Sequence, residues 1–341
     1  MTCSCVAFGE IMLRLDPAHG VRLVQAGSFE VRFTGAEANV AASLTQFGIP
    51  SRIVSTVPDD GLGDAALAFL RRFGLDTGAV LRRPGKLGLL YIEPGGAGRP
   101  GQVIYDRSGS VFALTGADAY DWPALLAGQD WLHVSGTAAA VGPGSAAALD
   151  QALAAAAAGT GVSLDLNYRA RLWTTEQAGR ALPSLLDRVD VLLGAGAEAV
   201  TILGLPAPPG WCPGQDLTTD QRIALMERTR DHFGLRAVAG TERSTTAGGR
   251  PALRGLISTA DGTAVSRAFP VTDERGRVGA GDAYAAGVIR GLLLGHPPQV
   301  VADFAAAAAY LKQSITGDVN IASVGEVEDA LTGHDDTRLR R

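Results

Sequence analysis

The chain contains 341 residues, of which 46% are hydrophobic and 19% charged, and its formal net charge is −5. This length allows one large α/β domain, with or without an appendage. Lys and Arg form no block that marks a nucleic-acid-binding face, so we expect no nucleic acid partner. No apolar run reaches the roughly 20 residues of a membrane span. The three cysteines do not suit a disulfide framework, and without a signal peptide they predict a soluble, cytoplasmic protein.

Short apolar runs alternate with helical stretches along most of the chain, which is typical of a parallel sheet wrapped by helices. The apolar runs predict strands at Val6–Phe8, Arg52–Val57, Trp131–Ser135, Val162–Asn167, Val189–Leu193 and Leu235–Ala239. The helical stretches are Gly35–Phe47, 63–73, Ser145–Ala158, Glu176–Leu186, Thr219–Phe233, Asp282–Leu294, Pro298–Lys312 and Gly325–Leu331. This order of elements predicts the α/β fold class.

Two segments interrupt the alternation. Met12–Phe33 and Lys86–Arg107 are strand-like and rich in turns, with no room for a helix. We expect them to pair into a small sheet that covers the site as a lid. The predicted organisation is a core of residues 1–11, 34–85 and 108–335, a β lid of residues 12–33 and 86–107, and a frayed tail at 336–341. Because lid strands have free edges, a homo-oligomer formed through the lid is left open.

The C-terminal third contains a glycine-rich turn, Gly279-Ala280-Gly281-Asp282, directly before a run of good helix formers. Such a turn brings backbone N–H groups together at the positive end of a helix, where they can bind an anion such as phosphate. A carboxylate there needs a task, and Asp282 could take a proton from an attacking hydroxyl. The pattern indicates phosphoryl transfer to an alcohol, although an ordinary loop with an acidic residue at a helix start looks the same.

Small residues open the helix at Gly35-Ala36-Glu37-Ala38-Asn39. They let a ligand approach the backbone closely, and Asn39 can both donate to and accept from a hydroxyl group. Taken alone, this segment is better explained by helix packing.

Polar residues also follow a buried strand, where Asn167 and Arg169 should emerge at the carboxyl edge of the sheet. Ligands collect at this edge in open α/β sheets. Together with Arg107, Arg169 offers two guanidinium groups for an anionic substrate or a phosphate, although most single arginines are solvated surface charge. Tyr91 and Tyr105 either border a sugar or pack the underside of the lid.

Several other classes of site are disfavoured by the motifs. The chain has no Walker motif and no Gly-x-Gly-x-x-Gly after a strand, which weakens P-loop and Rossmann interpretations. It has no Gly-x-Ser-x-Gly nucleophile turn. Five histidines without paired spacing predict no zinc site.

In combination, these residues resemble the ribokinase family of carbohydrate kinases over nearly the whole chain. The resemblance is carried by Gly9-Glu10, by residues 35–41, by Asp59-Asp60-x-x-Gly63 and by Gly279-Ala280-Gly281-Asp282. Four further stretches favour the branch that phosphorylates 2-keto-3-deoxygluconate: 91–93, 105–107, 165–173 and 316–320. The resemblance implies a ribokinase-like three-layer fold with a mostly parallel central sheet and a small β-sheet lid.

The resemblance also implies roles for individual residues. Asp282 would be the base, and the amides of Gly279, Ala280 and Gly281 would form an anion hole for the γ-phosphate of ATP. Asn167 would lie toward the ATP phosphates, with Gly279 and Gly281 also on the nucleotide side. Family members carry an Asn-x-x-Glu that organises Mg²⁺ through water, and the matching segment here, Ala195-Gly196-Ala197-Glu198, keeps only the acid. The sugar site would be lined by Gly35, Ala36, Asn39, Tyr91, Tyr105, Arg107, Arg169 and Asp318.

The expected activity is ATP- and Mg²⁺-dependent phosphorylation of a sugar acid, most closely 2-keto-3-deoxygluconate to its 6-phosphate. Two arginines near the site fit the carboxylate of such a substrate. A kinase for a neutral sugar such as fructose or ribose, or for a nucleoside, remains the alternative. A catalytically weak sugar-binding protein is a further alternative, supported by Ala195 alone.

Overall fold

The computed structural model describes residues 3–93, 95, 99–194, 196–246, 248–271 and 278–332. The predicted frayed tail at 336–341 and the Ala195 substitution lie outside these residues. Within the described part of the chain, no helix is long and apolar enough to cross a membrane.

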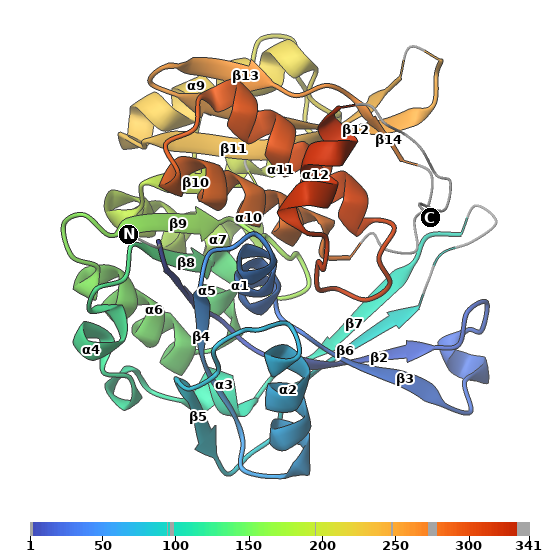
Figure 1. The fold of residues 1–341 in the computed structure, drawn as a ribbon, viewed down its shortest axis with the longest axis vertical. Coiled ribbons are helices and arrows are strands. Elements are labelled where there is room, and N and C mark those ends of the chain that lie inside the picture. Colours follow the sequence, from blue (N-terminus) through green and yellow to red (C-terminus); the bar gives the residue numbers. More distant parts are fainter. Residues whose placement is uncertain are drawn as a thin grey trace.

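A ten-stranded sheet forms the centre of the molecule, in the order β13-β12-β11-β10-β9-β8-β1-β4-β5, with β14 paired to β12 (Figure 1). The seven strands from β11 to β5 run parallel, and the strands beyond β11 pair antiparallel. The strands are β1 Cys5–Phe8, β4 Ser51–Pro58, β5 Val80–Arg83, β8 Trp131–Ser135, β9 Gly161–Asp165, β10 Val191–Leu193, β11 Ala237–Thr245, β12 Pro251–Thr259, β13 Gly262–Val265 and β14 Phe269–Pro270.

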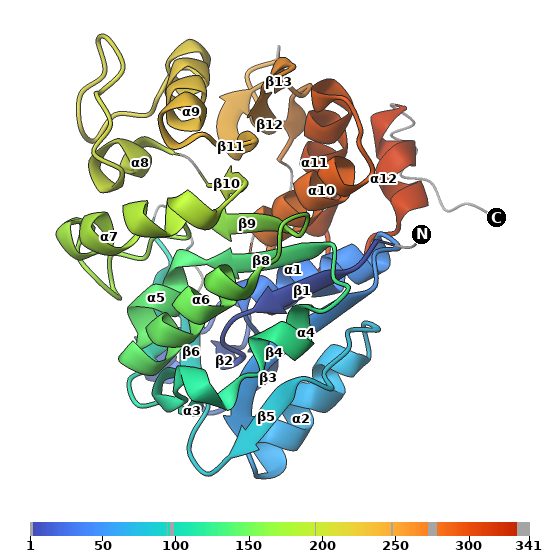
Figure 2. The same cartoon turned by 90° about the vertical axis from the view of Figure 1, so that its left-hand side faces the viewer.

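Helices cover both faces of this sheet, which gives three layers (Figure 2). One apolar core is shared by α1, α10, α11 and α12, and a second by helices α4 to α9 on the opposite face. The α-helices are α1 Ala36–Gln46, α2 Gly61–Arg71, α3 Val111–Leu114, α4 Trp122–Leu126, α5 Gly136–Val141, α6 Pro143–Ala155, α7 Thr175–Ala181, α8 Ala197–Ile202, α9 Thr219–Phe233, α10 Ala280–Leu293, α11 Pro298–Lys312 and α12 Val324–Leu331. Short 3₁₀ turns occupy Leu23–Gln25, Ala117–Ala119 and Pro183–Arg188.

A separate four-stranded sheet projects from one side of the core (Figure 1). Its order is β3-β2-β6-β7, with β2 at Met12–Pro17, β3 at Phe29–Thr34, β6 at Gly88–Glu93 and β7 at Gln102–Asp106. Both interrupting segments of the sequence thus meet in one sheet, which confirms the predicted mostly parallel core with a second small sheet. The division into core and lid domains at the stated residue boundaries stays a prediction.

The structure departs from the predicted elements at several places. Strand β5 and the short helices α3, α4, α5 and α8 were not predicted. The helix predicted at Glu176–Leu186 ends at Ala181, because Pro183 cannot continue the α-helical hydrogen bonds, and a 3₁₀ turn follows. The antiparallel strands β12 to β14 were not predicted. One end of β12 is exposed and the other is buried on both faces. Its sequence therefore does not show the regular alternation of polar and apolar residues that predicts a strand.

Candidate active site

Asp282 lies in the first turn of α10, and its Oδ2 accepts a hydrogen bond of 2.8 Å from Nδ2 of Asn39 on α1. Asn39 is buried, and its Oδ1 has no hydrogen-bond partner among the described residues. The two helices therefore bring a carboxylate and an amide together from positions 243 residues apart. A buried, unpaired carbonyl oxygen is costly, so Asn39 is ready to accept a hydrogen bond from a ligand hydroxyl.

The N-terminus of α10 is open to a ligand. Its N-cap residue, Gly279, has a φ of 86°, and no side chain of the described residues caps the helix. The first-turn N–H groups of an uncapped helix lack intrahelical partners and carry the positive end of the helix dipole. A Cβ at Gly281 would meet no described residue within 4 Å, whereas one at Gly279 would lie 1.9 Å from the carbonyl oxygen of Asp318. The turn thus has one crowded and one open side.

Electrostatics raise the pKa of Asp282 to about 7. Burial is the largest cause, because it penalises the charged carboxylate. The hydrogen bond from Asn39 lowers the pKa, while the nearby carboxylates of Asp165 and Asp318 raise it and the Arg169 guanidinium lowers it. A carboxyl group with a pKa near neutrality is suited to exchanging a proton with a substrate.

Asp318 joins this site to the lid. Its side chain is 1% exposed and forms an ion pair with Arg14 of β2, whose Nε also bonds to Asp16 at 2.9 Å. The other carboxylate oxygen of Asp318, Oδ2, is buried without a hydrogen-bond partner among the described residues. Like the free oxygen of Asn39, it is an acceptor that a sugar hydroxyl could satisfy.

Arg107 is buried and already has an anionic partner. Its Nε donates to Oε2 of Glu10 at 2.5 Å, and its guanidinium lies 5.9 Å from the centre of the Tyr105 ring. Glu10 in turn contacts the glycine before α1, because a Cβ at Gly35 would lie 2.3 Å from the Glu10 carbonyl oxygen. Ala36 begins α1 immediately after that glycine. Arg107, Tyr105 and Gly35 therefore form one connected group around Glu10.

A second group of polar residues follows β9 and β10. The backbone N–H of Asn167 donates to Oδ1 of Asp165 at 2.9 Å, and Asn167 has a φ of 40°, a conformation that Asn tolerates better than most residues. Burial raises the pKa of the Asp165 carboxyl, and the charge of Glu198 in the first turn of α8 raises it further. Arg169 is exposed, and its charge acts on both Asp165 and Asp282.

Tyr91 does not share a face of the lid sheet with Tyr105, the other tyrosine predicted for the sugar site. In the lid sheet, Tyr91 pairs with Leu15 and Ile104, whereas Tyr105 pairs with Leu90 and so shares a face with Arg14. Because side chains alternate between the two faces of a sheet, Tyr91 and Tyr105 lie on opposite faces. The Tyr91 ring packs edge-on against Phe29, with centroids 6.1 Å apart.

The structure adds site contacts for three residues to which the sequence patterns assigned no role in the site: Glu10, Arg14 and Asp165. Arg14 and Asp16 alternate with apolar residues on β2, and their side chains are nearly buried. This alternation, typical of a strand with one polar face, is the sequence signal that could have identified Arg14. Asp165 could also have been predicted as a site residue, because it ends β9 and Asn167 follows it by two residues. Nothing local to Glu10 indicates its pairing with Arg107, which is 97 residues away.

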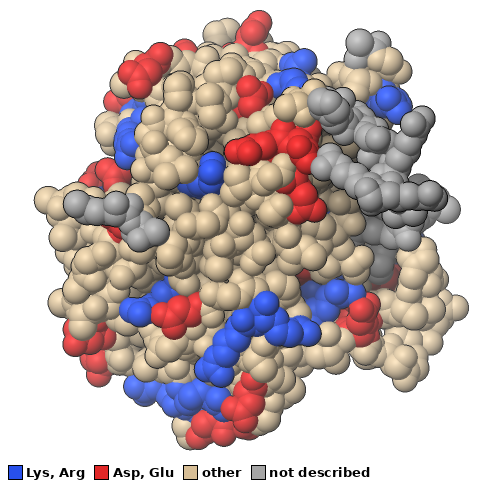
Figure 3. Space-filling view, in the orientation of Figure 1, with Lys and Arg blue, Asp and Glu red and all other residues tan. Residues whose placement is uncertain are grey.

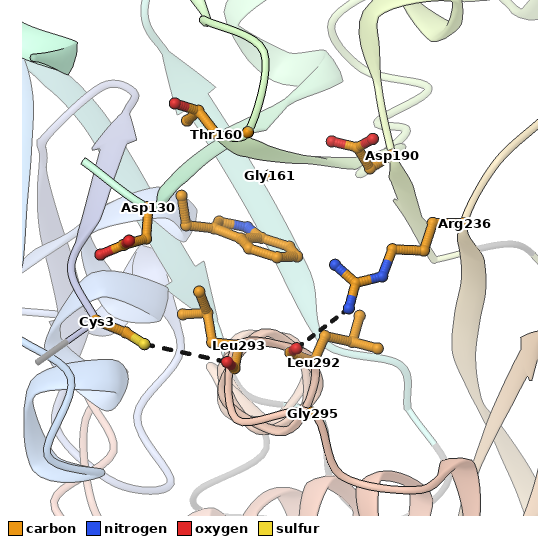
Figure 4. A pocket seen from close by; sticks show the side chains of 11 residues that line it. Cys3, Asp130, Thr160, Gly161, Asp190, Arg236, Leu292, Leu293 and Gly295 are labelled. Atoms are coloured by element: carbon orange, nitrogen blue, oxygen red, sulfur yellow. Dashed lines mark hydrogen bonds between the residues drawn. The ribbon is translucent and has the colours of Figure 1, made fainter. Parts of the chain in front are cut away.

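A cavity of about 510 Å³ lies elsewhere, at the amino ends of the central strands (Figure 4). Its wall includes Asp130, Asp190 and Arg236 and the last turn of α10, where Arg236 donates to the carbonyl of Leu292 at 3.2 Å. None of the predicted site residues lines it. The cavity and the candidate active site are therefore at opposite ends of α10.

A three-layer α/β core, a projecting lid sheet and a polar site where the two meet define the class of ribokinase-like sugar kinases. The sequence model of the pfkB family carbohydrate kinases matches residues 3–322, and the chain belongs to this family. It is thus a carbohydrate kinase, as the resemblance in the sequence implied.

Relatives with known names cover almost the whole chain. A 2-dehydro-3-deoxygalactonokinase from Haloferax volcanii is 31% identical, over 98% of this chain and 98% of the relative. The crystal structure of 2-dehydro-3-deoxygluconokinase from Thermotoga maritima is 35% identical, with a TM-score of 0.88 over 98% of this chain and 99% of the other. A putative ribokinase II from E. coli, solved with ATP and Mg²⁺, has a TM-score of 0.78 at 20% identity over 97% of this chain and 100% of the other, and shows the shared fold.

Proposed function

We propose that the protein transfers the γ-phosphate of ATP to the terminal hydroxyl of a 2-keto-3-deoxy sugar acid, with 2-keto-3-deoxygluconate as the leading candidate. The observation that carries the proposal is the Asp282 carboxylate, held by Asn39 beside an uncapped helix N-terminus. The Haloferax volcanii relative and the Thermotoga maritima protein are both named as kinases of 2-dehydro-3-deoxy sugar acids, which supports this substrate class.

In the proposed reaction, Asp282 takes the proton of the sugar hydroxyl while the oxygen of that hydroxyl attacks the γ-phosphorus of ATP. A bond forms between these two atoms, the bond from the γ-phosphorus to the β,γ-bridging oxygen breaks, and ADP leaves. The N–H groups of Gly279, Ala280 and Gly281 would donate to the oxygens of the transferred group, where negative charge must be stabilised. The free acceptors of Asn39 and Asp318 would orient the sugar through its hydroxyl groups.

Magnesium would be held on the nucleotide side. Asp165 and Glu198 are close enough for the charge of one to raise the pKa of the other, and carboxylates are ligands that Mg²⁺ prefers. Because Mg²⁺ usually takes one or two carboxylates and completes its shell with water and phosphate, two acids fit it. The described residues contain no group of three or more metal-ligating side chains, which agrees with such a shared site. Bound Mg²⁺ would neutralise charge on the ATP phosphates.

A neutral sugar is the second candidate, because two of the cations near the sugar site already have anionic partners. Arg107 pairs with Glu10, and Arg14 pairs with Asp318. Arg169 has no carboxylate within ion-pair distance among the described residues and is the better candidate for a substrate carboxylate.

The test compares 2-keto-3-deoxygluconate with fructose, ribose and adenosine as acceptors, using wild type, Arg169→Met and Arg171→Met. Loss of a charged hydrogen bond to the substrate should raise the KM for the keto acid about 10- to 100-fold in Arg169→Met. Arg171 is an exposed arginine two residues along and serves as the matched control. Turnover confined to a neutral acceptor, or an unchanged KM in Arg169→Met, would reject the sugar acid assignment.

We also propose that the outer face of the lid joins two copies of the chain. One row across the four strands carries Val31, Leu15, Tyr91 and Ile104, and Val31 is 56% exposed. On the face drawn in Figure 3, acidic side chains gather above the middle and a basic stripe lies below it. The cytoplasmic location stays a prediction.

A further inference from the structure

Lys312 is a buried cation that the proposed reaction leaves without a task. It ends α11 and has a relative exposure of 0%, although it carries an ammonium group. Its Nζ donates to the carbonyl oxygens of Ile315 at 3.0 Å and Gly317 at 2.7 Å. Burying an ammonium is costly unless its surroundings compensate for the lost water, and a methionine would fill the same space without that cost.

The two carbonyls belong to a loop that forms one wall of the site. Gly317 directly precedes Asp318, whose carboxylate pairs with Arg14. The backbone carbonyl of Asp318 lies so close to Gly279 that a Cβ there would meet it at 1.9 Å. The position of this loop therefore sets both the Asp318 side chain and the turn that begins α10.

Charge links Lys312 to the same place. Burial lowers the pKa of Lys312 to about 8, while the carboxylates of Asp318 and Asp282 raise it and the guanidinium groups of Arg14 and Arg32 lower it. The ammonium thus lies near the proposed base and below the turn that would receive the phosphoryl group.

We propose that Lys312 is a positioning residue whose ammonium acts as a built-in monovalent cation, binding the carbonyls of Ile315 and Gly317 and so fixing Asp318 against Gly279. The effect on catalysis rests on the proposed function. The binding of the Lys312 ammonium by the carbonyls of Ile315 and Gly317, here called the cation cage, does not depend on it. An ammonium donates hydrogen bonds to carbonyl oxygens and an ion such as K⁺ coordinates them directly, but both bring a single positive charge to the same acceptors. A chain that supplies its own cation should need none from solution.

The test uses Lys312→Ala, Lys312→Met and Ser314→Ala. Alanine leaves space for a free cation, methionine fills it, and Ser314 is an exposed residue at the same helix end that serves as the control. In choline buffer, Lys312→Ala should lose about 100-fold in kcat, as expected when reacting groups are misplaced, with a smaller change in the KM values. Added NH₄⁺ or K⁺ should restore part of kcat in Lys312→Ala and none in Lys312→Met.

A second readout needs no activity. Added NH₄⁺ or K⁺, relative to choline, should raise the melting temperature of Lys312→Ala, and leave wild type and Lys312→Met unchanged. If wild type phosphorylates no sugar, the proposed function fails while this measurement still tests the cage. Strong stimulation of wild type by K⁺, full kcat in Lys312→Ala without added cation, or a destabilised Lys312→Ala that no cation rescues would each overturn the proposal. Should the variants not fold, cation independence of wild type remains the deciding measurement.

Discussion

At the scale of single residues, Asp282 has properties that folding alone would not favour. Its carboxyl is half-buried and lies near two other acids, so its pKa rises from 3.8 to about 7. A raised carboxyl pKa means that the folded state holds the anion less well than the unfolded state does. The folded protein therefore loses stability as the pH rises from about 4 to 7, and this loss persists above 7.

This shift predicts two pH dependences. If Asp282 is the base, kcat should rise with pH through an apparent pKa near 7, because the carboxylate form is the active one. Asp282→Asn should lower kcat by about 10²- to 10⁴-fold and remove that step. The same variant should melt at a higher temperature than wild type at pH 8, and the difference should vanish near pH 4. Wild-type kcat that is flat between pH 6 and 8, together with an active Asp282→Asn, would contradict the assignment.

Sequence patterns identified which residues belong to the site, but they did not identify which of these residues contact one another. Gly279 to Asp282, Asn39 and Asp318 come together in the structure. The first two groups lie at the starts of α10 and α1, where local signals are strong, and Asp318 lies in the loop after α11. The ion pairs of Glu10 with Arg107 and of Arg14 with Asp318 join positions 97 and 304 residues apart. Such pairs depend on strand order and register, which no local pattern encodes.

At the scale of elements, the turn before α10 separates two roles that glycine can have. Gly279 has a left-handed φ and touches Asp318, so it is needed for the fold of the turn. Gly281 faces open space, so its lack of a side chain matters only if a ligand occupies that space.

We therefore expect opposite profiles for two alanine substitutions. Gly279→Ala should lower both the melting temperature and kcat, because its Cβ would clash with the Asp318 carbonyl. Gly281→Ala should keep the wild-type melting temperature yet lose activity, because its methyl group would enter the proposed phosphoryl site. Thermal denaturation and steady-state kinetics on both variants provide the check. A fully active Gly281→Ala would argue against an anion site at this turn.

Elements whose ends carry clear signals were predicted closely, and edge elements were not. Thr218 and Gly234 cap α9, and a proline begins α11. α9 and α11 have the predicted bounds, and β8 does too. The antiparallel edge β12 to β14 escaped notice because its strands are exposed at one end, so neither regular alternation nor a continuous apolar run marks them.

At the scale of the whole molecule, the lid leaves an apolar surface that the described residues do not cover. Phe29, Val31 and Ile104 on its outer face are 39%, 56% and 37% exposed. Exposed apolar strands of this kind mark either an interface or an aggregation-prone edge.

The proposed lid interface predicts a change of mass with one substitution. Wild type should sediment as a dimer or a higher oligomer, and Val31→Lys should shift it toward the monomer, because a buried lysine would lose its water. Leu114→Lys changes an apolar residue on α3, away from the lid, that is still more exposed than Val31, and should leave the sedimentation coefficient unchanged. A wild type that is monomeric at every concentration would rule out the interface.

The order of the strands also sets when the enzyme can become active during its synthesis. β1 is made first but lies inside the sheet between β4 and β8, and helices α10 and α11, which share an apolar core with α1 and with Cys5 of β1, come near the end of the chain. Asp282 and Asp318 belong to this final stretch of chain. At roughly 5–20 residues per second, a ribosome needs on the order of 15–60 s to reach them. For that time the nascent chain exposes the surface that α10 and α11 later bury, and that period is when chaperones would matter most.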